Sequence, residues 1–220
     1  MIKFSGTVFD LDGVITETSN AHYEAWKELA NELGFDLPND VLDKIRGIPR
    51  MEALEIVLSY NDNGILLDES NKKNLAERKN EIYLDKIKNY SRRDLNDGVI
   101  ELLNLLKKNN KKIALASSSK NAEFLLKALE IYEYFDAVVD PTSVKKGKPD
   151  PEIFIRACEL IELEPNECIG IEDSQAGIES IKSAGMIPIG IGKHLKCEIK
   201  FDNILEFYQY LLEFQTHEDD

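Results

Sequence analysis

The chain has 220 residues, enough for one large domain or for a core with a smaller inserted domain. Its 41 acidic residues outnumber its 27 basic ones, and the resulting net charge of −14 opposes binding to nucleic acid or anionic lipid. Three cysteines without C-x-x-C spacing indicate neither a disulfide framework nor a structural zinc site, and no apolar stretch approaches the length of a membrane span. We expect a cytoplasmic monomer that binds neither nucleic acid nor a membrane.

The first apolar run, residues 4–9, leads directly into Asp10-Leu11-Asp12-Gly13. Side chains two positions apart in an extended strand share a face, so Asp10 and Asp12 can reach one reacting group while Leu11 packs the other way. Two carboxylates this close repel each other unless a divalent cation or a clamp for an anionic substrate compensates. The same tetrapeptide is common in ordinary turns, so by itself it leaves both interpretations open.

A helical region follows this motif. The first helix is predicted to begin with Ser19 or Asn20 as its cap and to stop at Gly34. No strand pattern appears from there to about residue 90. Three further segments have helical spacing and many charges: residues 40–45, 51–58 and 69–87. We therefore expect a small helical domain over residues 16–90.

The pattern changes at about residue 97, where strands begin to alternate with helices. The predicted strands cover residues 112–116, 137–139, 168–171 and 187–191, and the predicted helices cover residues 99–107, 121–129, 151–161 and 176–184. This alternation indicates the α/β class with a doubly wound parallel sheet, in which ligands bind beyond the carboxyl ends of the strands. We expect this core domain over residues 1–15 and 91–220.

Polar side chains follow the later strands at that same edge. They are the stretch from Ser117 to Asn121, Lys148 in the loop before Pro149, and the pair Glu172-Asp173. Carboxylates, hydroxyls and a lysine in one crevice indicate phosphoryl transfer, and Asp10 with Asp173 can hold Mg²⁺ through hard oxygen ligands. Each group alone also fits a helix cap or a surface turn, but convergence from four strand ends favours a reactive site.

These motifs resemble the strand-end pattern of the haloacid dehalogenase superfamily, carried here by Asp10-Leu11-Asp12-Gly13, Ser117, Lys148 and Glu172-Asp173. Finer matches are similar to the β-phosphoglucomutase family within it. They are residues 9–16, 46–50, 78–80, 114–121 and 171–178, together with His22 and Trp26. The resemblance covers essentially the whole chain and implies that the helical insert is a cap domain.

That resemblance implies interconversion of β-D-glucose 1-phosphate and glucose 6-phosphate through an aspartyl phosphate and glucose 1,6-bisphosphate. Asp10 would be the nucleophile and Asp12 the general acid and base, while Ser117 and Lys148 would hold the phosphoryl group. Mg²⁺ would be bound by Asp10, the backbone carbonyl of Asp12 and Asp173, with Glu172 nearby. The implied substrate-binding residues are Thr18, His22, Trp26, Arg46, Gly47, Arg50, Lys79, Ser118, Ser119 and Asn121.

Several of these residues also fit ordinary structural roles. Trp26 suits hydrophobic packing of its helix, His22 a capping turn, and Lys79 a solvated helix face. Two positions depart from the mutase pattern, with Arg46 in place of the usual lysine and Glu17 in place of aspartate. Arginine keeps the charge at position 46 but changes the shape of the donor.

Two other functions remain as alternatives. A sugar-phosphate phosphatase of the same superfamily could share every core residue and differ only in how its cap excludes water. A non-catalytic sugar-phosphate-binding protein is disfavoured, because it would be expected to lose the nucleophile or the metal ligands, and both Asp10 and Asp173 are present.

Overall fold

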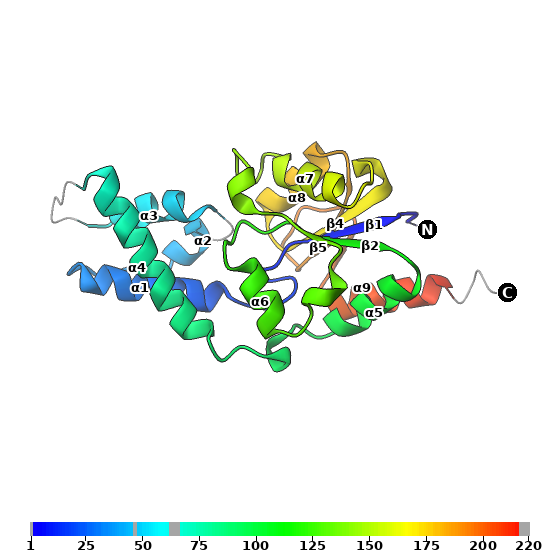
Figure 1. Ribbon diagram of the computed structural model, residues 1–220, viewed down its shortest axis with the longest axis horizontal. Coiled ribbons are helices and arrows are strands. Elements are labelled where there is room, and N and C mark those ends of the chain that lie inside the picture. Colours follow the sequence, from blue (N-terminus) through cyan, green and yellow to red (C-terminus); the bar gives the residue numbers. More distant parts are fainter. Residues whose placement is uncertain (1, 46–47, 62–66, 216–220) are drawn as a thin grey trace. The chain divides into compact units, whose positions relative to one another are not determined.

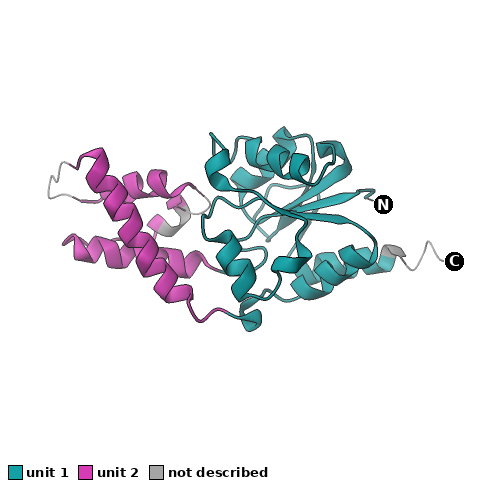
Figure 2. Cartoon of the chain, viewed as in Figure 1, with its two compact units in different colours: residues 1–17, 91–220 teal, residues 18–90 magenta. Residues whose placement is uncertain are grey.

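The structure is a computed structural model that describes residues 2–45, 48–61 and 67–215. The chain divides into two compact units (Figure 2). Unit 1 comprises residues 1–17 and 91–220, and unit 2 comprises residues 18–90. The helical unit begins two residues later than the 16–90 expected from the sequence. The reason is that Thr16 pairs with Leu95 and donates its hydroxyl to the carbonyl oxygen of Asp94 at 2.5 Å, both within unit 1.

Unit 1 contains a six-stranded sheet in which every neighbouring pair is parallel. Its order is β3-β2-β1-β4-β5-β6. The strands are β1 (Gly6–Phe9), β2 (Lys112–Leu115), β3 (Ala137–Val138), β4 (Cys168–Glu172), β5 (Ile187–Ile191) and β6 (Lys200–Phe201). All four residues of β1 are buried, as expected of a central strand covered on both faces. Phe9 pairs with Leu115 and with Ile171, so three strands end side by side.

Helices cover both faces of this sheet. They are α5 (Val99–Lys108), α6 (Ala122–Ala128), α7 (Glu152–Leu160), α8 (Gln175–Ser183) and α9 (Ile204–Gln215), with short 3₁₀ turns at Arg92–Asp94, Tyr132–Tyr134, Pro141–Ser143 and Pro165–Glu167. Figure 1 shows α7 and α8 on one face and α5, α6 and α9 on the other. The predicted doubly wound α/β fold is therefore confirmed.

The sequence analysis did not predict the last strand and helix of unit 1, β6 and α9. β6 has only two residues, of which Lys200 is exposed and Phe201 half-buried, so it carries no strand pattern of its own. β6 is positioned by pairing with β5 and by packing against α9, where the ring centroids of Phe207 and Phe201 lie 5.2 Å apart. Tertiary contacts decide both elements.

The described residues of unit 2 form four helices, as predicted. They are α1 (Ser19–Glu32), α2 (Val41–Ile45), α3 (Arg50–Leu58) and α4 (Glu69–Ile87). α1 packs along α4, with Leu29 and Ile82 among the buried side chains. Ion pairs link exposed positions of these two helices, and each exposed pair contributes about 1 kcal/mol or less. Burial of apolar side chains is therefore the main source of stability in this unit.

In the described part of the chain, no helix combines the length and the apolar character that crossing a bilayer requires.

Candidate active site

The carboxyl end of the sheet brings together the charged residues that the sequence singled out. Asp10 follows β1, Glu172 ends β4, and Lys148 comes from the loop between β3 and α7. The Lys148 Nζ atom lies 2.5 Å from Oδ1 of Asp10 and 2.7 Å from Oε1 of Glu172. All three side chains are at least nine-tenths buried. The surface-turn alternative for Lys148 is therefore wrong, since a buried lysine between two carboxylates is a built ionic site.

The electrostatics of this cluster are dominated by burial. Burial raises the pKa of Asp10 well above its ordinary value, Lys148 opposes that rise, and the carboxylates of Glu172, Asp12 and Asp173 add to it. Burial by itself would lower the pKa of Lys148, but Asp10 and Glu172 outweigh it and raise that pKa. Lys148 is therefore a permanent cation, and the surplus of carboxylates around it favours a further positive charge at the site.

That surplus takes the form of a candidate cation site. Carboxylate oxygens of Asp10, Glu172 and Asp173 all lie within 4.8 Å of one another. Gly13 lies directly against the Asp173 carboxylate, because a Cβ atom at position 13 would meet its Oδ2 at 2.1 Å. Two of these carboxylates are buried and Asp173 is half-buried. Clustered, hard oxygen donors are the ligands that Mg²⁺ prefers, so the residues present fit this ion.

The loop after β2 presents hydroxyl groups at the same edge. Ser117 is buried, and its Oγ accepts a hydrogen bond from the backbone N–H of Ser119 at 3.1 Å. The hydroxyl of Ser119 in turn accepts from the backbone N–H of Asn121 at 3.2 Å. Helix α6 has Asn121 as its N-cap, without a side-chain capping bond, so the helix-cap alternative is wrong for this stretch. Ser119 closes the turn before the helix, while Ser117 keeps its own O–H as a donor. Ser118 and Asn121 are partly exposed on this loop.

Two supporting residues were missed by the sequence reading. The side-chain amide of Asn96 donates to the carbonyl oxygens of Gly13 at 3.1 Å and Val14 at 2.9 Å, and it thereby holds the loop that follows Asp12. Gly177, in α8, packs so closely against Glu172 that a Cβ atom there would lie 2.0 Å from its Cδ. An asparagine in a turn and a glycine in a helix were the available signals, but neither indicates its distant partner.

Unit 2 buries a second set of the predicted residues. Lys79 is only 3% exposed, so the interpretation of it as a solvated face residue is wrong. Its ammonium donates to Nδ1 of His22 at 2.7 Å and lies 4.9 Å from the ring centroids of both Trp26 and Tyr83. The His22 ring stacks on the Tyr83 ring, with 3.9 Å between the ring centroids. We call Lys79, His22, Trp26 and Tyr83 the cationic cluster.

His22 is a neutral member of this cluster. Burial lowers its pKa well below the ordinary value, and the charges of Lys79 and Arg50 lower it further. Because both cations act on one imidazole, they lie in the same part of unit 2. Arg50 also donates to the side-chain oxygen of Asn80 at 2.8 Å.

The remaining residues predicted for substrate binding are placed as follows. His22 is the fourth residue of α1, and its ring stacks on Tyr83 and contacts Lys79 instead of capping the helix, so the capping-turn alternative is wrong. Trp26 is buried, which agrees with its packing alternative, and it also faces the Lys79 ammonium. Thr18 is fully buried at the start of α1. Arg46 and Gly47 lie outside the described residues.

Comparison with known proteins identifies the family of the chain. The family model for haloacid dehalogenase-like hydrolases matches residues 5–185. The chain is 43% identical to a β-phosphoglucomutase of Bacillus subtilis, over 84% of this chain and 82% of that protein. It is 35% identical to a phosphorylated carbohydrates phosphatase of Thermotoga maritima, over 81% of each chain.

A solved structure gives the same assignment. The crystal structure of β-phosphoglucomutase from Clostridium difficile superposes with a TM-score of 0.90 at 37% identity, covering 96% of both chains. The predicted resemblance to the superfamily is therefore confirmed on sequence and on structure. The chain belongs to the haloacid dehalogenase-like hydrolase family.

Proposed function

We propose that this protein is a β-phosphoglucomutase that interconverts β-D-glucose 1-phosphate and glucose 6-phosphate through a phosphorylated Asp10. One observation carries the proposal beyond the family: unit 2 buries the cationic cluster around Lys79, with Arg50 close to it. A mutase that passes through a sugar bisphosphate must bind the phosphate that is not being transferred, whereas a phosphatase needs only one phosphate site. A half-buried Arg50 near the buried Lys79 is suited to that second phosphate and to the sugar that carries it.

The phosphoryl group would move twice. Phosphorylated Asp10 gives its phosphoryl group to the 6-hydroxyl of β-glucose 1-phosphate, so that an O–P bond to the sugar forms as the bond to Asp10 breaks. The bisphosphate then returns its 1-phosphoryl group to Asp10, and glucose 6-phosphate leaves. Lys148, together with a bound cation, would keep the Asp10 carboxylate ionised against the effect of burial. Splitting the exchange into two displacements lets this one residue serve both directions.

Asp12 would move the proton in both steps. It follows Asp10 by two residues in the turn after β1, and its carboxylate is close enough to raise the pKa of Asp10. Asp12 takes the proton of the 6-hydroxyl in the first displacement and returns it to the departing 1-oxygen in the second. Such general acid–base catalysis is worth roughly 10²–10⁴ in rate.

Lys148 and Ser117 would bind the oxygens of the transferring group. Lys148 is a permanent cation 2.5 Å from Asp10, and the Ser117 hydroxyl keeps a hydrogen to donate. Mg²⁺ held by Asp10, Asp173 and the backbone carbonyl of Asp12, with Glu172 nearby, would supply charge neutralisation for that group. The protein groups act where the negative charge develops, which is the largest source of rate in such reactions.

In this proposal unit 2 is a cap domain that selects the sugar phosphate. Arg50 would bind the second phosphate through its planar fork of donors, and Lys79, ordered by His22, would bind sugar oxygens. The remaining proposed contacts are Thr18, Trp26, Arg46 and Gly47 from unit 2, and Ser118, Ser119 and Asn121 from unit 1. We further propose that the protein is cytoplasmic and monomeric. Sedimentation of the purified protein would test the monomeric state.

A sugar-phosphate phosphatase is the second candidate, favoured by the 35% identity to the Thermotoga maritima phosphatase. A product assay separates the two. Purified protein is given Mg²⁺, β-glucose 1-phosphate and a catalytic amount of β-glucose 1,6-bisphosphate, and both glucose 6-phosphate and inorganic phosphate are measured. We expect isomerisation with only slow phosphate release. Phosphate release at least as fast as glucose 6-phosphate formation would replace the mutase with the phosphatase.

A further inference from the structure

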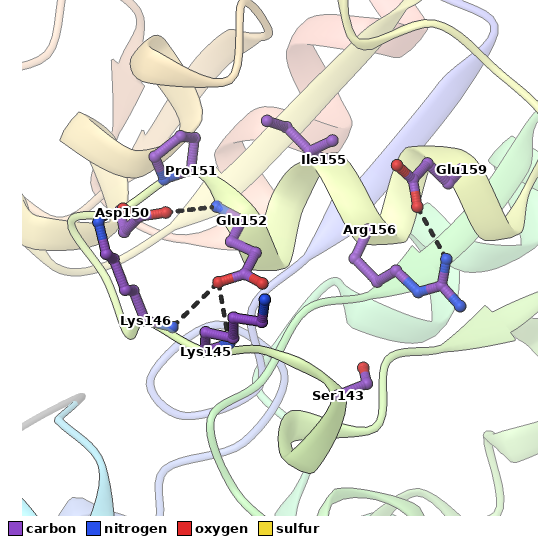
Figure 3. A pocket seen from close by; sticks show the side chains of 9 residues that line it. All are labelled: Ser143, Lys145, Lys146, Asp150, Pro151, Glu152, Ile155, Arg156 and Glu159. Carbon is purple, nitrogen blue, oxygen red and sulfur yellow. Dashed lines mark hydrogen bonds and ion pairs between the residues drawn. The ribbon is translucent and has the colours of Figure 1, made fainter.

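The segment that carries Lys148 is tied to the first turn of α7 by one carboxylate (Figure 3). Oε2 of Glu152 accepts hydrogen bonds from the backbone N–H groups of Lys145 at 2.9 Å and Lys146 at 3.0 Å. The backbone N–H of Glu152 donates to Oδ1 of Asp150 at 3.1 Å, which closes the segment from its other side. The Glu152 carboxylate therefore holds the main chain just before Lys148.

The opposite end of this segment is held independently. The hydroxyl of Ser180, in α8, donates to the carbonyl oxygen of Asp150 at 2.6 Å. Between these anchors, Lys148 reaches inward to Asp10 and Glu172, and its ammonium lies 5.0 Å from the ring centroid of Phe154. The lysine tip is thus bonded at the site, while its backbone depends on Glu152 and Ser180 for its position.

We propose that Glu152 is a positioning residue for Lys148: by binding two consecutive N–H groups of the incoming segment, it holds the lysine where it can bind the transferring phosphoryl group. This inference rests on the role proposed above for Lys148. A charged acceptor forms stronger hydrogen bonds than a neutral one, which suits a carboxylate to ordering a loop. A displacement of about 1 Å in a catalytic group can cost about 10²-fold in rate. Loss of the Glu152 hydrogen bonds could therefore slow phosphoryl transfer by shifting Lys148.

A purely structural role predicts something different. An acidic residue in the first turn of any helix interacts favourably with the helix dipole, and its loss lowers stability alone. Positioning predicts in addition a fall in the rate of phosphoryl transfer. Glu159 provides the matched control, because it is an exposed glutamate of the same helix whose side chain binds Arg156 at 2.8 Å, away from this segment (Figure 3).

The test compares Glu152→Ala, Glu152→Gln and Glu159→Ala. Phosphorylation of Asp10 by acetyl phosphate is measured alongside kcat and KM for β-glucose 1-phosphate. We expect Glu152→Ala to lower the phosphorylation rate and kcat by about 10- to 100-fold with little change in KM. Glu152→Gln should recover most of that loss, because its amide oxygen can accept the same two bonds. Glu159→Ala should behave as the wild type.

Amide hydrogen exchange supplies a readout that does not depend on activity. The segment borders a pocket of about 350 Å³ that is lined in part by Lys145 and Lys146, so water reaches their amides once the carboxylate is removed. Exchange at these two amides should accelerate in Glu152→Ala and stay unchanged in Glu159→Ala. Faster exchange with wild-type kcat would overturn the positioning role, and so would an equal loss of kcat in Glu159→Ala.

The proposed function can fail without this inference failing. If the wild type is phosphorylated by acetyl phosphate but does not isomerise the sugar, the mutase is wrong, while the phosphorylation rates of the Glu152 variants still decide the positioning role. If Glu152→Ala does not fold, Glu152→Gln and Glu152→Asp are compared instead. A shorter carboxylate should then be slower than the amide of full length, and equal rates would contradict the proposal.

Discussion

Gly13 lies against Asp173 so closely that a methyl group on residue 13 would meet the carboxylate oxygen Oδ2 at 2.1 Å. The backbone at Gly13 is also left-handed, with φ of 83°, where a side chain is strained regardless of space. Asn96 holds the same glycine by its carbonyl oxygen. The turn after Asp12 is therefore shaped to fit beside the Asp173 carboxylate.

We predict that Gly13→Ala disables the site more than it destabilises the fold. The methyl group can be accommodated by turning the Asp173 side chain away, which removes a proposed metal ligand. We expect the Mg²⁺ concentration for half-maximal activity to rise about tenfold or more. Gly185→Ala is the control, since its φ is also 83° but nothing lies within 4 Å of the added carbon.

Both variants should lose the same stability, about 1–2 kcal/mol for placing a Cβ on left-handed backbone, as measured by urea unfolding. Only Gly13→Ala should lose activity. A Gly13→Ala protein with wild-type Mg²⁺ dependence would mean that Asp173 does not need its observed position.

Gly177→Ala should lower both activity and stability, although helix propensity alone predicts that alanine would stabilise the helix. Alanine is favoured over glycine by about 0.8–1.0 kcal/mol in a helix interior. At this position, however, the new carbon would lie 2.0 Å from Cδ and Oε1 of Glu172, which is buried and paired with Lys148. Glu172 cannot move without breaking that pair. Ser183→Ala in the same helix is exposed and should leave activity unchanged, so equal behaviour of the two variants would refute the clash.

Removal of metal should abolish activity and lower stability. The carboxylates of Asp10, Glu172 and Asp173 repel one another in the apo protein, and Mg²⁺ relieves that repulsion when it binds the folded state. We expect Mg²⁺ to raise the Tm of the wild type but not of Asp173→Ala. Asp202→Ala, which removes an exposed partner of Lys193, should respond like the wild type. Full activity after exhaustive chelation would rule out the metal assignment.

Asp10 and Asp12 should give different phenotypes when changed to asparagine. Asp10→Asn should fold and acquire no acid-labile phosphate from acetyl phosphate, because the attacking carboxylate is gone. Asp12→Asn should still be labelled at Asp10 but turn over about 10²–10⁴-fold more slowly, since only proton transfer is lost. Mass spectrometry of the labelled protein locates the phosphate. Hydroxylamine-sensitive phosphate on Asp10→Asn would show that another residue is the nucleophile.

His22 should make the protein less stable as the pH falls below about 6.5. Burial, then Lys79 and Arg50, hold its pKa in the folded state well below the value of 6.5 expected on unfolding, so the unfolded chain binds the extra proton. Stability from this residue is complete above pH 6.5. It is lost at up to about 1.4 kcal/mol per pH unit below that, until the folded pKa is reached.

Urea unfolding of the wild type and His22→Gln at pH 7.5, 6.5 and 5.5 measures this effect. The difference in free energy of unfolding between the two proteins should shrink or reverse as the pH falls. His194→Gln, which changes an exposed histidine, should follow the wild type throughout. A constant difference between wild type and His22→Gln across this range would disprove the burial of a neutral His22.

The sequence by itself determined the alternation of strands and helices, the four-helix insert and the strand ends at which the polar residues gather. These features are local: apolar runs set the strands, helical spacing sets the helices, and the carboxyl ends of parallel strands must meet at one edge. The sequence alone therefore assigns Asp10, Ser117, Lys148 and Glu172 to that edge. The family resemblance followed from the same motifs and their order.

Only the tertiary structure decided which atoms meet. Lys148 binds Asp10, 138 positions away, and nothing in the local pattern distinguishes this lysine from a solvated one. The highly charged α4 gave no sign that Lys79 is buried, because that depends on how α4 packs against α1. Asn96, Gly177 and Glu152 support the site through contacts that carry no periodic signal. Side-chain pairing is set by packing between distant segments, and sequence periodicity reports only the local half of that packing.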